Sequence, residues 1–281
     1  MERWLLISNC QTTGLANAFQ MVNPRFSVTP MDIWSFSQNV EGAMATFGDY
    51  FRVLISPEIL NIPGADFSSA PNLTLIPFIY FTAYHPDCIY AVDANGPVKG
   101  PLDAYHSLIA IAAYRRGLSQ QDAMALYRGE FYERCGFMDY WAPQRDRLVA
   151  DFAGYGFDIQ QEVRRWGRHQ SFMHSIDHPK IHCLYDMARV IMASMGVPCV
   201  EANLLPQDNL KASSAWAVYP EIGEHLGVEG SYRFKRFGAY HHIGLQELIA
   251  ESYAAYEQSP PDTVEPHPNW SQAFERVMGA I

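Results

Sequence analysis

A thiol and its neighbours near the start of the sequence could carry acyl-transfer chemistry. Only Asn9 separates Cys10 from the apolar run Trp4–Ser8, and a segment with helical periodicity follows Cys10. At the start of a helix, the dipole lowers the pKa of a thiol toward the reactive thiolate. The backbone N–H groups of Cys10 and Gln11 would also point at an acyl oxygen bound there, with Asn9 as a polar flank. Free Cys is equally often a small buried hydrophobe, so position alone leaves both interpretations open.

A second polar segment, Met173–His182, carries three His at a spacing of four. On one helix these imidazoles would form a metal-binding face. Pro179 argues against that helix, because it biases His178 away from helical backbone angles. We therefore expect a loop without a metal ion, in which His178 is the general base and Asp177 stands beside it. His174 of the same loop is a candidate substrate contact.

The other candidate substrate contacts lie in two short segments beside predicted elements. Residues 84–87 come just past the apolar run Leu73–Phe81, and ligands bind at the carboxyl ends of strands in open parallel sheets. Residues 103–107 open a predicted helix, where Asp103 can equally be a simple helix cap. The candidates are Tyr84, His85, Asp87, Tyr105, His106 and Ser107.

The elements that must position these residues begin as strands alternating with helices. A helical pattern follows Cys10 through Met21, and Pro77 interrupts the strongest strand candidate. Strands separated by helices require parallel crossovers, which predicts an α/β sheet. The predicted strands are Trp4–Ser8, Asp32–Phe36, Arg52–Ile55 and Leu73–Phe81.

From about residue 103 the sequence becomes mainly helical. Gly residues after several helical patterns and Pro residues at the start of others indicate where the predicted helices end and begin. We expect one domain over residues 1–281, with a sheet core in 1–100 and a large helical addition in 101–281. The predicted helices are Asp103–Arg116, Ser119–Gly136, Pro143–Ala153, His182–Met195, His242–Tyr256 and Asn269–Ile281, with short strands at Val197–Ala202 and Arg233–Phe237.

Composition excludes several classes of function. Over 281 residues, 20 Lys and Arg against 30 Asp and Glu give a net charge of −10, which argues against broad binding to nucleic acid or anionic lipid. A hydrophobic fraction of 48% with 18% charged residues is typical of a folded core. The five Cys form no CxxC pair, and no signal-like or membrane-spanning run occurs. These features predict a reduced, cytoplasmic protein without a membrane span.

Five short motifs together resemble the WcbI-type capsular polysaccharide biosynthesis family. They extend from residue 5 to about residue 196, and each alone is weak. By this resemblance the fold is a three-layer, flavodoxin-like sheet similar to that of SGNH/GDSL hydrolases. The motifs are Asn-Cys-Gln at 9–11, the segment Pro77–Asp87 ending in Tyr-His-Pro-Asp, Asp103–Ser107, Arg116–Ser119 and Met173–Lys180.

The resemblance also implies an activity and its substrates. The family is associated with coenzyme A and with O-acetylation of a sugar, so the implied substrates are acetyl-CoA and a glycan or nucleotide-sugar acceptor. Cys10 matches the position of the nucleophilic Ser of SGNH enzymes, and His178 matches their base. The SGNH signature has its Asp three residues before the His, whereas Asp177 is adjacent, which leaves the orienting acid unassigned.

The sequence thus predicts a CoA-dependent acyltransferase, and the resemblance implies that acetyl is the acyl group. A glycan or acyl esterase on the same scaffold is one alternative, and a non-catalytic CoA- or glycan-binding protein is another. Aromatic surface could serve a glycan or a homodimer interface equally well. The residues chosen for the CoA phosphates are Arg115, Arg116 and Lys180.

Overall fold

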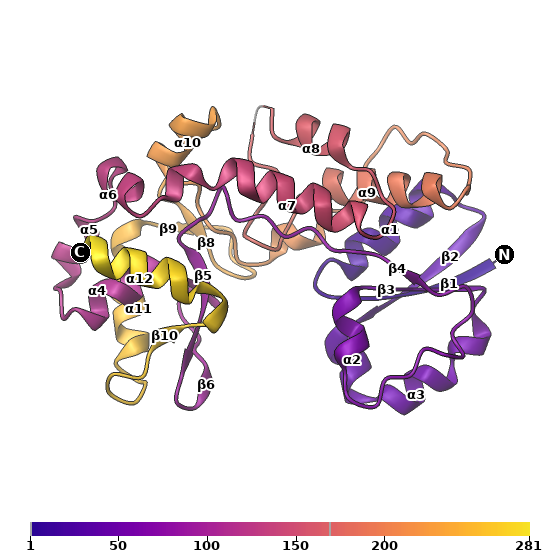
Figure 1. Ribbon diagram of the computed structural model, residues 1–281, viewed down its shortest axis with the longest axis horizontal. Coiled ribbons are helices and arrows are strands. Elements are labelled where there is room, and N and C mark those ends of the chain that lie inside the picture. Colours follow the sequence, from indigo (N-terminus) through magenta and orange to yellow (C-terminus); the bar gives the residue numbers. More distant parts are fainter. Residues whose placement is uncertain (1, 169) are drawn as a thin grey trace. The chain divides into compact units, whose positions relative to one another are not determined.

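The chain folds into two units, each assembled from three separate stretches of sequence (Figure 1). The computed structural model describes residues 2–168 and 170–281. Unit 1 contains the parallel sheet, and unit 2 contains a small antiparallel sheet covered by helices. Unit 1 comprises Met1–Tyr80, Asp146–Trp166 and His178–Leu210, and unit 2 comprises Phe81–Arg145, Gly167–Asp177 and Lys211–Ile281.

The sheet of unit 1 has four parallel strands in the order β2-β1-β3-β4. Its central strand β1 is an apolar run whose residues 4–8 are all buried, as expected for a parallel strand covered on both faces. Parallel strands share one carboxyl edge, and Cys10 lies two residues past the end of β1. The strands are β1 (Glu2–Ser8), β2 (Phe26–Asp32), β3 (Arg52–Ile55) and β4 (Thr74–Leu75).

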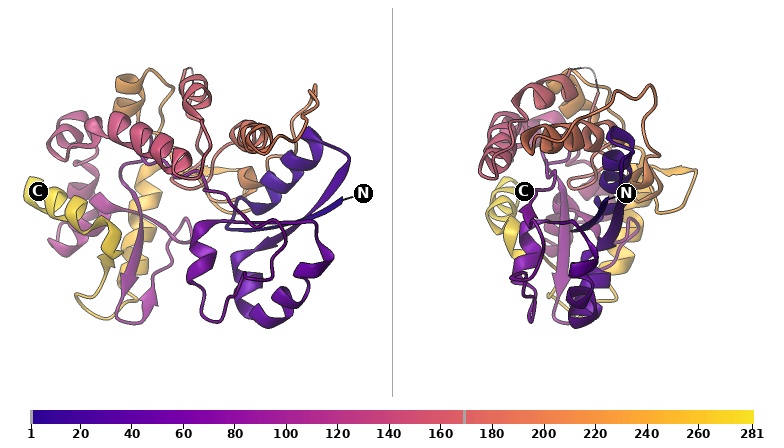
Figure 2. Two further views of the ribbon diagram at one scale, coloured as in Figure 1. Left: turned by 45° about the vertical axis from the view of Figure 1, so that its right-hand side comes forward. Right: turned by 90° about the vertical axis from the view of Figure 1, so that its right-hand side faces the viewer.

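Helices cover both faces of this sheet, which gives three layers (Figures 1 and 2). On one face lie α1 (Thr12–Val22) and α9 (Ile181–Ser194), and on the other lie α2 (Ile33–Gln38) and α3 (Val40–Ala45). The side chains of Phe36, Phe47 and Phe67 stack beneath the second face. The predicted α/β sheet class is confirmed.

A close approach at Gly14 joins the first turns of α1 and α9. A Cβ atom at Gly14 would lie 2.8 Å from Leu184 Cδ1 and 3.4 Å from Ile181 Cδ1, so a larger residue would push the helices apart. The residues that directly precede the two helices, Cys10 and His178 among them, are therefore brought close to each other.

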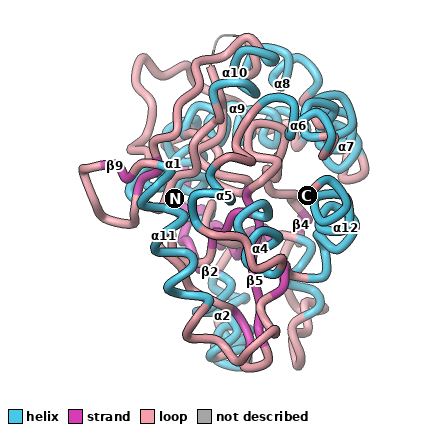
Figure 3. The backbone as a smooth tube through the Cα atoms, turned by 90° about the vertical axis from the view of Figure 1, so that its left-hand side faces the viewer, coloured by secondary structure: helices cyan, strands magenta, loops and turns pink. Residues whose placement is uncertain are grey.

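In unit 2, strand β5 pairs antiparallel with β6, β7 and β10. Helix α4, almost wholly buried, follows β7 at once and lies between α11 and α12 (Figure 3). The elements are β5 (Cys88–Asp93), β6 (Gly96–Pro97), β7 (Tyr105–Ser107), α4 (Leu108–Arg115), α11 (Leu245–Tyr256), β10 (Glu265–Pro266) and α12 (Ser271–Ala280).

The remaining elements are short and lie mainly in the second half of the chain. No helix among the described residues is long and apolar enough to cross a membrane. The helices are α5 (Gln120–Met124), α6 (Gly129–Arg134), α7 (Trp141–Ala153), α8 (Gln160–Trp166) and α10 (Pro220–Leu226); the strands are β8 (Phe234–Lys235) and β9 (His242–Ile243); 3-10 turns occupy Phe47–Asp49, Pro57–Asn61, Phe137–Asp139, Asn209–Ala212 and Pro268–Trp270.

Several predicted elements were wrong in type or extent. The predicted helix Ser119–Gly136 is two helices, because α5 (Gln120–Met124) ends five residues before α6 (Gly129–Arg134) begins. Asp32–Phe36 is not a strand, because Asp32 ends β2 and its side chain caps α2 through the Ser35 N–H at 2.7 Å. Only Thr74–Leu75 of the run Leu73–Phe81 pairs as a strand. The predicted helix at Asp103 begins five residues later, since 105–107 form β7, and residues 197–202 form no strand.

The helices of the second half are shared between the two units. The chain leaves unit 1 after Tyr80 and returns to it twice, so α8 and α9 complete the unit that holds the parallel sheet. The described fold therefore does not divide at residue 100. That residues 1–281 form one WcbI-like domain stays a prediction.

Candidate functional site

Cys10 lies in a tight turn between β1 and α1. The side chain of Asn9 fixes this turn, because its Oδ1 accepts the N–H of Gln11 at 3.0 Å. The Asn9 carbonyl accepts both the N–H and the hydroxyl of Thr12, at 3.1 and 2.6 Å. The half-buried Cys10 thiol lies 3.9 Å from Asn9 Oδ1. The predicted strand–thiol–helix arrangement is confirmed.

Both the backbone and the side chain of Gln11, a predicted oxyanion contact, have partners in the structure. Its backbone N–H is bonded to Asn9, so it is not available as an oxyanion donor in this arrangement. Its buried side-chain amide pairs with the backbone of Ile79: Nε2 donates to the carbonyl at 2.7 Å, and Oε1 accepts the N–H at 3.1 Å. Gln11 therefore holds the extended chain after β4 in place.

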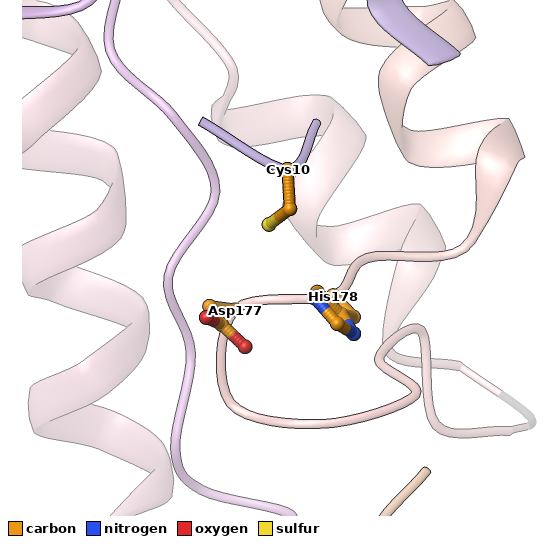
Figure 4. A group of neighbouring side chains, drawn as sticks. All are labelled: Cys10, Asp177 and His178. Atoms are coloured by element: carbon orange, nitrogen blue, oxygen red, sulfur yellow. The ribbon is translucent and has the colours of Figure 1, made fainter. Parts of the chain in front are cut away.

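The imidazole of His178 lies close to the Cys10 thiol within unit 1. A ring nitrogen of His178 and Cys10 Sγ are within 4.8 Å of each other (Figure 4). Residues 174–180 form a loop, as the sequence predicts, and α9 begins at Ile181. The contact between α1 and α9 at Gly14 explains why these two loop residues meet. Such a distance is suitable for a base that tightens onto its nucleophile when substrate binds.

Asp177 directly precedes His178 in the chain, and its carboxylate is held within unit 2. Both Tyr90 and Tyr105 donate their hydroxyls to it, and Ser175 Oγ lies 3.0 Å from its Oδ1. Tyr105, a predicted substrate contact, donates its hydroxyl to Asp177, and its substrate role stays a prediction. Sequence analysis missed Tyr90 and Ser175, because only the pairing of β5 with β7 shows that Tyr90 stands opposite Tyr105.

The motif residue Asp87 is completely buried, and its carboxylate contacts the first turn of α4. Its carboxylate accepts the hydroxyls of Ser107 and Tyr219 at 2.5 Å each and the N–H of Ile109 at 2.8 Å. Burial raises its pKa from 3.8 to about 7, against the opposing effect of these donors. Ser107 in turn caps α4 by accepting the N–H of Ala110 at 3.0 Å. These contacts give both predicted site residues a structural role.

Tyr84 and His85 are also buried in unit 2. The ring of Tyr84 packs among those of Phe81, Trp141 and Phe172. His85 Nδ1 lies 3.2 Å from the carbonyl oxygen of Ala217. Both contacts fit a packing role for these side chains, and the predicted substrate role has no support from them.

His106 is a core histidine. Its ring lies between the carbonyl of Val98, 3.0 Å from Nε2, and the hydroxyl of Tyr256, 3.2 Å from Nδ1. Burial lowers its pKa from 6.5 to about 4, so the ring is neutral near pH 7. Gly100 makes room for it, because a Cβ there would lie 2.8 Å from His106 Cε1.

The three predicted phosphate-binding residues separate into two groups. Arg115 pairs with Glu265 at 3.1 Å, and Arg116 donates to the carbonyl of Met278 at 2.8 Å, so both tie α4 to the C-terminal segments. These contacts argue against a CoA role for either Arg. Lys180 is half-buried at the N-cap of α9, two residues after His178. His174 is half-buried, and its carbonyl accepts the N–H of Trp216 at 2.8 Å.

The other four Cys have environments that suppress thiolate formation. Burial raises the pKa of Cys88 and Cys183 well above its usual value and that of Cys135 to about 12. The exposed Cys199 also has a raised pKa, mainly through partial desolvation. Cys10 is therefore the thiol best placed to react, since an imidazole lies beside it.

Cys10 and His178 also form a donor pair for a soft metal ion. Thiolate and imidazole are the usual ligands of Zn²⁺, and Asp177 adds a carboxylate next in the chain. The donor set fits such an ion chemically, although the Asp177 oxygens already accept hydroxyl hydrogens. The expectation of a metal-free site stays a prediction.

Comparison with known proteins finds one matching family model and a solved structure of similar fold. Residues 3–199 match the family model described as "Polysaccharide biosynthesis enzyme WcbI". A similar solved structure covers 99% of this chain and 95% of its own, with a TM-score of 0.69 and 14% sequence identity. It is described as native WcbI, a polysaccharide biosynthesis enzyme, without a disulfide bond between CoA and one of its cysteines. No protein of curated function matches the sequence.

Proposed function

Because the chain belongs to the WcbI family of polysaccharide biosynthesis enzymes, we propose that it is a CoA-dependent acyltransferase acting on a sugar hydroxyl. The observation that carries this proposal is the pairing of Cys10 and His178 at the carboxyl edge of the parallel sheet. A thiol at a strand-to-helix turn with an imidazole beside it is the arrangement of an activated nucleophile. Acetyl is the acyl group and a capsule or other polysaccharide sugar is the acceptor in this proposal.

The proposed reaction has two transfers. In the first, His178 accepts the proton of Cys10, and Sγ attacks the carbonyl carbon of acetyl-CoA. The bond from that carbon to the CoA sulfur breaks, and the CoA thiolate takes the proton from His178. In the second, His178 accepts the proton of the sugar hydroxyl, whose oxygen attacks the acyl-Cys10 carbonyl. The bond from the acyl carbon to Sγ breaks, and His178 gives the proton to the Cys10 thiolate.

Thioester exchange suits a Cys nucleophile energetically. The acyl group moves from one thioester to another, so the first transfer is close to isoenergetic. The second forms a more stable oxygen ester, which draws the reaction forward. A hydrolase needs no such match between donor and nucleophile, and this favours transfer over the esterase alternative.

The likeness to native WcbI supports CoA as the donor. That native protein is described as lacking a disulfide bond between CoA and one of its cysteines. In this chain Cys10 is the thiol with an imidazole neighbour, and Lys180 lies two residues past His178. We propose Lys180 as a contact for a CoA phosphate. A thiol that must stay reduced also fits the cytoplasm.

The test is intact mass after mixing the protein with acetyl-CoA. We expect the wild type and Cys199→Ala, a control that removes a different non-buried thiol, to gain one acetyl group. Cys10→Ala should gain none. CoA binding by calorimetry without an adduct would contradict the covalent step and favour direct transfer. Absence of both adduct and binding would contradict the CoA proposal, and ester hydrolysis by such a protein would identify an esterase.

The role of His178 has its own test. The rate of Cys10 alkylation by iodoacetamide should rise with pH through a midpoint well below the ~8.5 of a free thiol. In His178→Ala the midpoint should move up toward that value. An ordinary midpoint already in the wild type would favour a non-catalytic binding protein.

A further inference from the structure

A pocket of about 460 Å³ lies within unit 2, beside the hairpin of β8 and β9 that projects at the label β9 in Figure 3. All of its lining residues belong to unit 2. Its volume is in the range of pockets that hold small molecules. The side chains that line it include Lys99, Asp103, Ser214, Arg236 and Phe237.

Backbone pairing fixes the hairpin side of this pocket. Lys235 and Ala215 exchange two backbone hydrogen bonds, at 3.1 and 2.9 Å, and the Gly238 N–H donates to the Ala212 carbonyl at 2.9 Å. The Lys235 ammonium also donates to the Ala212 carbonyl, at 3.1 Å. These bonds hold the start of the hairpin against the segment that contains Ser214.

Ser214 has a hydroxyl group without a partner. The residue is only 4% exposed, and its Oγ makes no hydrogen bond with any described residue. Buried hydroxyl groups are normally hydrogen-bonded, because desolvation without a partner is unfavourable. Since Ser214 lines the pocket, a ligand bound there can supply this partner.

Arg236 offers further hydrogen-bond donors beside Ser214. Its Nη2 donates to Glu247 at 2.9 Å and also to Glu251. Its Nη1 makes no hydrogen bond within the described part of the chain, and its Nε is buried there without a partner. The two carboxylates therefore balance the charge of the guanidinium and leave some of its N–H groups unused.

Asp103 and Lys99 lie on the other side of the pocket. Their ion pair of 3.1 Å is exposed to solvent, and pairs of this kind open readily. Asp103 has a φ of 60°, a left-handed conformation that Gly adopts more easily than other residues. Its backbone closes a tight turn with Gly100 through bonds of 2.8 and 3.1 Å. A carboxylate kept at such a position indicates a use for that side chain.

Phe237 presents an apolar ring at the pocket. The residue is 73% exposed, and Tyr240 in the same hairpin is completely exposed. Exposed aromatic rings gathered on one segment are typical of a binding surface. A pyranose ring has an apolar C–H face and a rim of hydroxyl groups. It therefore matches an aromatic ring that stands beside unused hydrogen-bonding groups.

The charges around the pocket favour a neutral ligand. A phosphate or carboxylate would need an unpaired cation, whereas Lys99 is paired with Asp103, and Arg236 with Glu247 and Glu251. Hydroxyl groups both donate and accept, so they can bond to the members of such pairs without a net charge. This argues for a sugar rather than a nucleotide.

We infer that this pocket binds a neutral pyranose unit of the acceptor glycan. Phe237 stacks on the sugar ring. Arg236 Nη1 donates to a ring hydroxyl, and Ser214 and Asp103 take part in bonds to others. The identification of the glycan as the acceptor rests on the proposed function, whereas the binding itself needs only unit 2.

The test measures binding of neutral trisaccharides to the full-length protein by ligand-observed NMR. The probes are maltotriose, cellotriose, mannotriose and galactotriose, with ADP as the nucleotide probe. We expect at least one trisaccharide to bind in the millimolar range, and Phe237→Ala to weaken its binding by about 10-fold. Trp34→Ala, which removes an exposed aromatic ring from α2 in unit 1, should bind as the wild type does.

Two further variants test the polar contacts. Ser214→Ala should weaken trisaccharide binding by about fivefold, since one hydrogen bond is lost. Asp103→Gly removes the carboxylate and suits the left-handed backbone, so binding should weaken while the melting temperature does not fall. In both variants Cys10 should still gain an acetyl group from acetyl-CoA, because that step requires no acceptor.

Each failure has a distinct result. Binding of none of the trisaccharides, or binding that Phe237→Ala leaves unchanged, would overturn the inference. ADP binding that Phe237→Ala abolishes would overturn it in favour of a nucleotide site. Trisaccharide binding that depends on Phe237, in a protein whose Cys10 is never acetylated, would support the sugar pocket while the proposed acyl transfer fails.

Discussion

Gln11 and Ile79 pair through two hydrogen bonds between a side-chain amide and a backbone peptide. The amide nitrogen of Gln11 donates to the Ile79 carbonyl at 2.7 Å, and the Ile79 N–H donates to the amide oxygen at 3.1 Å. The last backbone bond from this segment to β3 is that of the Ile76 N–H to the Ile55 carbonyl at 2.9 Å, and Pro77 follows it. The residue after the Cys10 thiol thus satisfies backbone groups that the sheet does not.

Replacing Gln11 by Leu should destabilise the protein by about 2–4 kcal/mol, because a buried N–H and a buried carbonyl would both lose their partner. Denaturant unfolding measures this change, with the exposed Gln121→Ala as the control, which should stay within about 0.5 kcal/mol of the wild type. Equal stability of Gln11→Leu and Gln121→Ala would show that the paired amide contributes nothing.

Widening the contact between α1 and α9 should separate Cys10 from His178. Gly14→Ala meets only the flexible ends of the Leu184 and Ile181 side chains, so we expect activity to persist. Gly14→Leu should cost about 3 kcal/mol or more through overpacking and should remove the acetyl adduct. Gly279→Leu is the matched control in α12, where a Cβ meets nothing within 4 Å. Acyl transfer retained by Gly14→Leu would contradict this account of the site.

Asp87 should make stability fall as pH rises toward neutrality. Its folded pKa of about 7 lies above the ordinary value of 3.8, so the folded state binds a proton more tightly than the unfolded state. The stabilisation is complete below pH 3.8 and is lost as pH rises through 7. Relative to Asp87→Asn, the wild type should be more stable at pH 5 than at pH 8 by on the order of 3 kcal/mol.

Unfolding by denaturant at both pH values checks this prediction. His106 contributes in the opposite direction, because its lowered pKa of about 4 makes stability fall on acidification. Its contribution is present in both proteins and cancels in the comparison. A stability difference between wild type and Asp87→Asn that does not change with pH would refute the assignment.

Lys180 and Arg116 should affect CoA binding differently. We expect Lys180→Ala to weaken CoA binding several-fold, since a phosphate contact is lost. Arg116→Ala should leave CoA affinity unchanged and lower stability by about 1 kcal/mol, because its bond to the Met278 carbonyl ties α12 to α4. Calorimetry with CoA and with dephospho-CoA measures both. Weakened binding in Arg116→Ala alone would reverse the assignment.

Zinc should act on the site as an inhibitor. Micromolar Zn²⁺ should bind the Cys10 thiolate and the His178 imidazole, raise the melting temperature and block acetylation. The rise should vanish in Cys10→Ala and persist in Cys199→Ala. Mg²⁺, which prefers oxygen ligands, should have no effect. Activity that EDTA abolishes and Zn²⁺ restores would instead show a resident metal.

The local patterns of the sequence predicted the parallel sheet and the thiol turn. The apolar run before Cys10, the helical spacing after it and Pro179 beside His178 each determine structure within a few residues. The prediction of a strand at Asp32–Phe36 was wrong, because Asp32 is the cap of helix α2. Such caps lie at the boundary between two patterns, and local spacing does not separate them.

Several predicted site residues have structural contacts that depend on distant partners, and their functional roles stay predictions. Asp87 meets Tyr219, and His106 meets Tyr256, more than a hundred residues later. Both side chains are buried and hydrogen-bonded by these partners, which fits a structural contribution. Tyr90 was missed because its place beside Asp177 depends on its pairing with Tyr105 across two strands. Such pairings are set by tertiary topology rather than by local spacing.

Because the two units alternate along the chain, they cannot be separated by a single cut in the gene. Six consecutive stretches alternate between the two units, so the backbone crosses from one unit to the other five times. No single cut in the gene yields either unit whole: a product ending at Tyr80 has the sheet without α9, and one beginning at Phe81 has α9 without its sheet. Recombination can therefore exchange the Cys10–His178 pair between genes only as one undivided block.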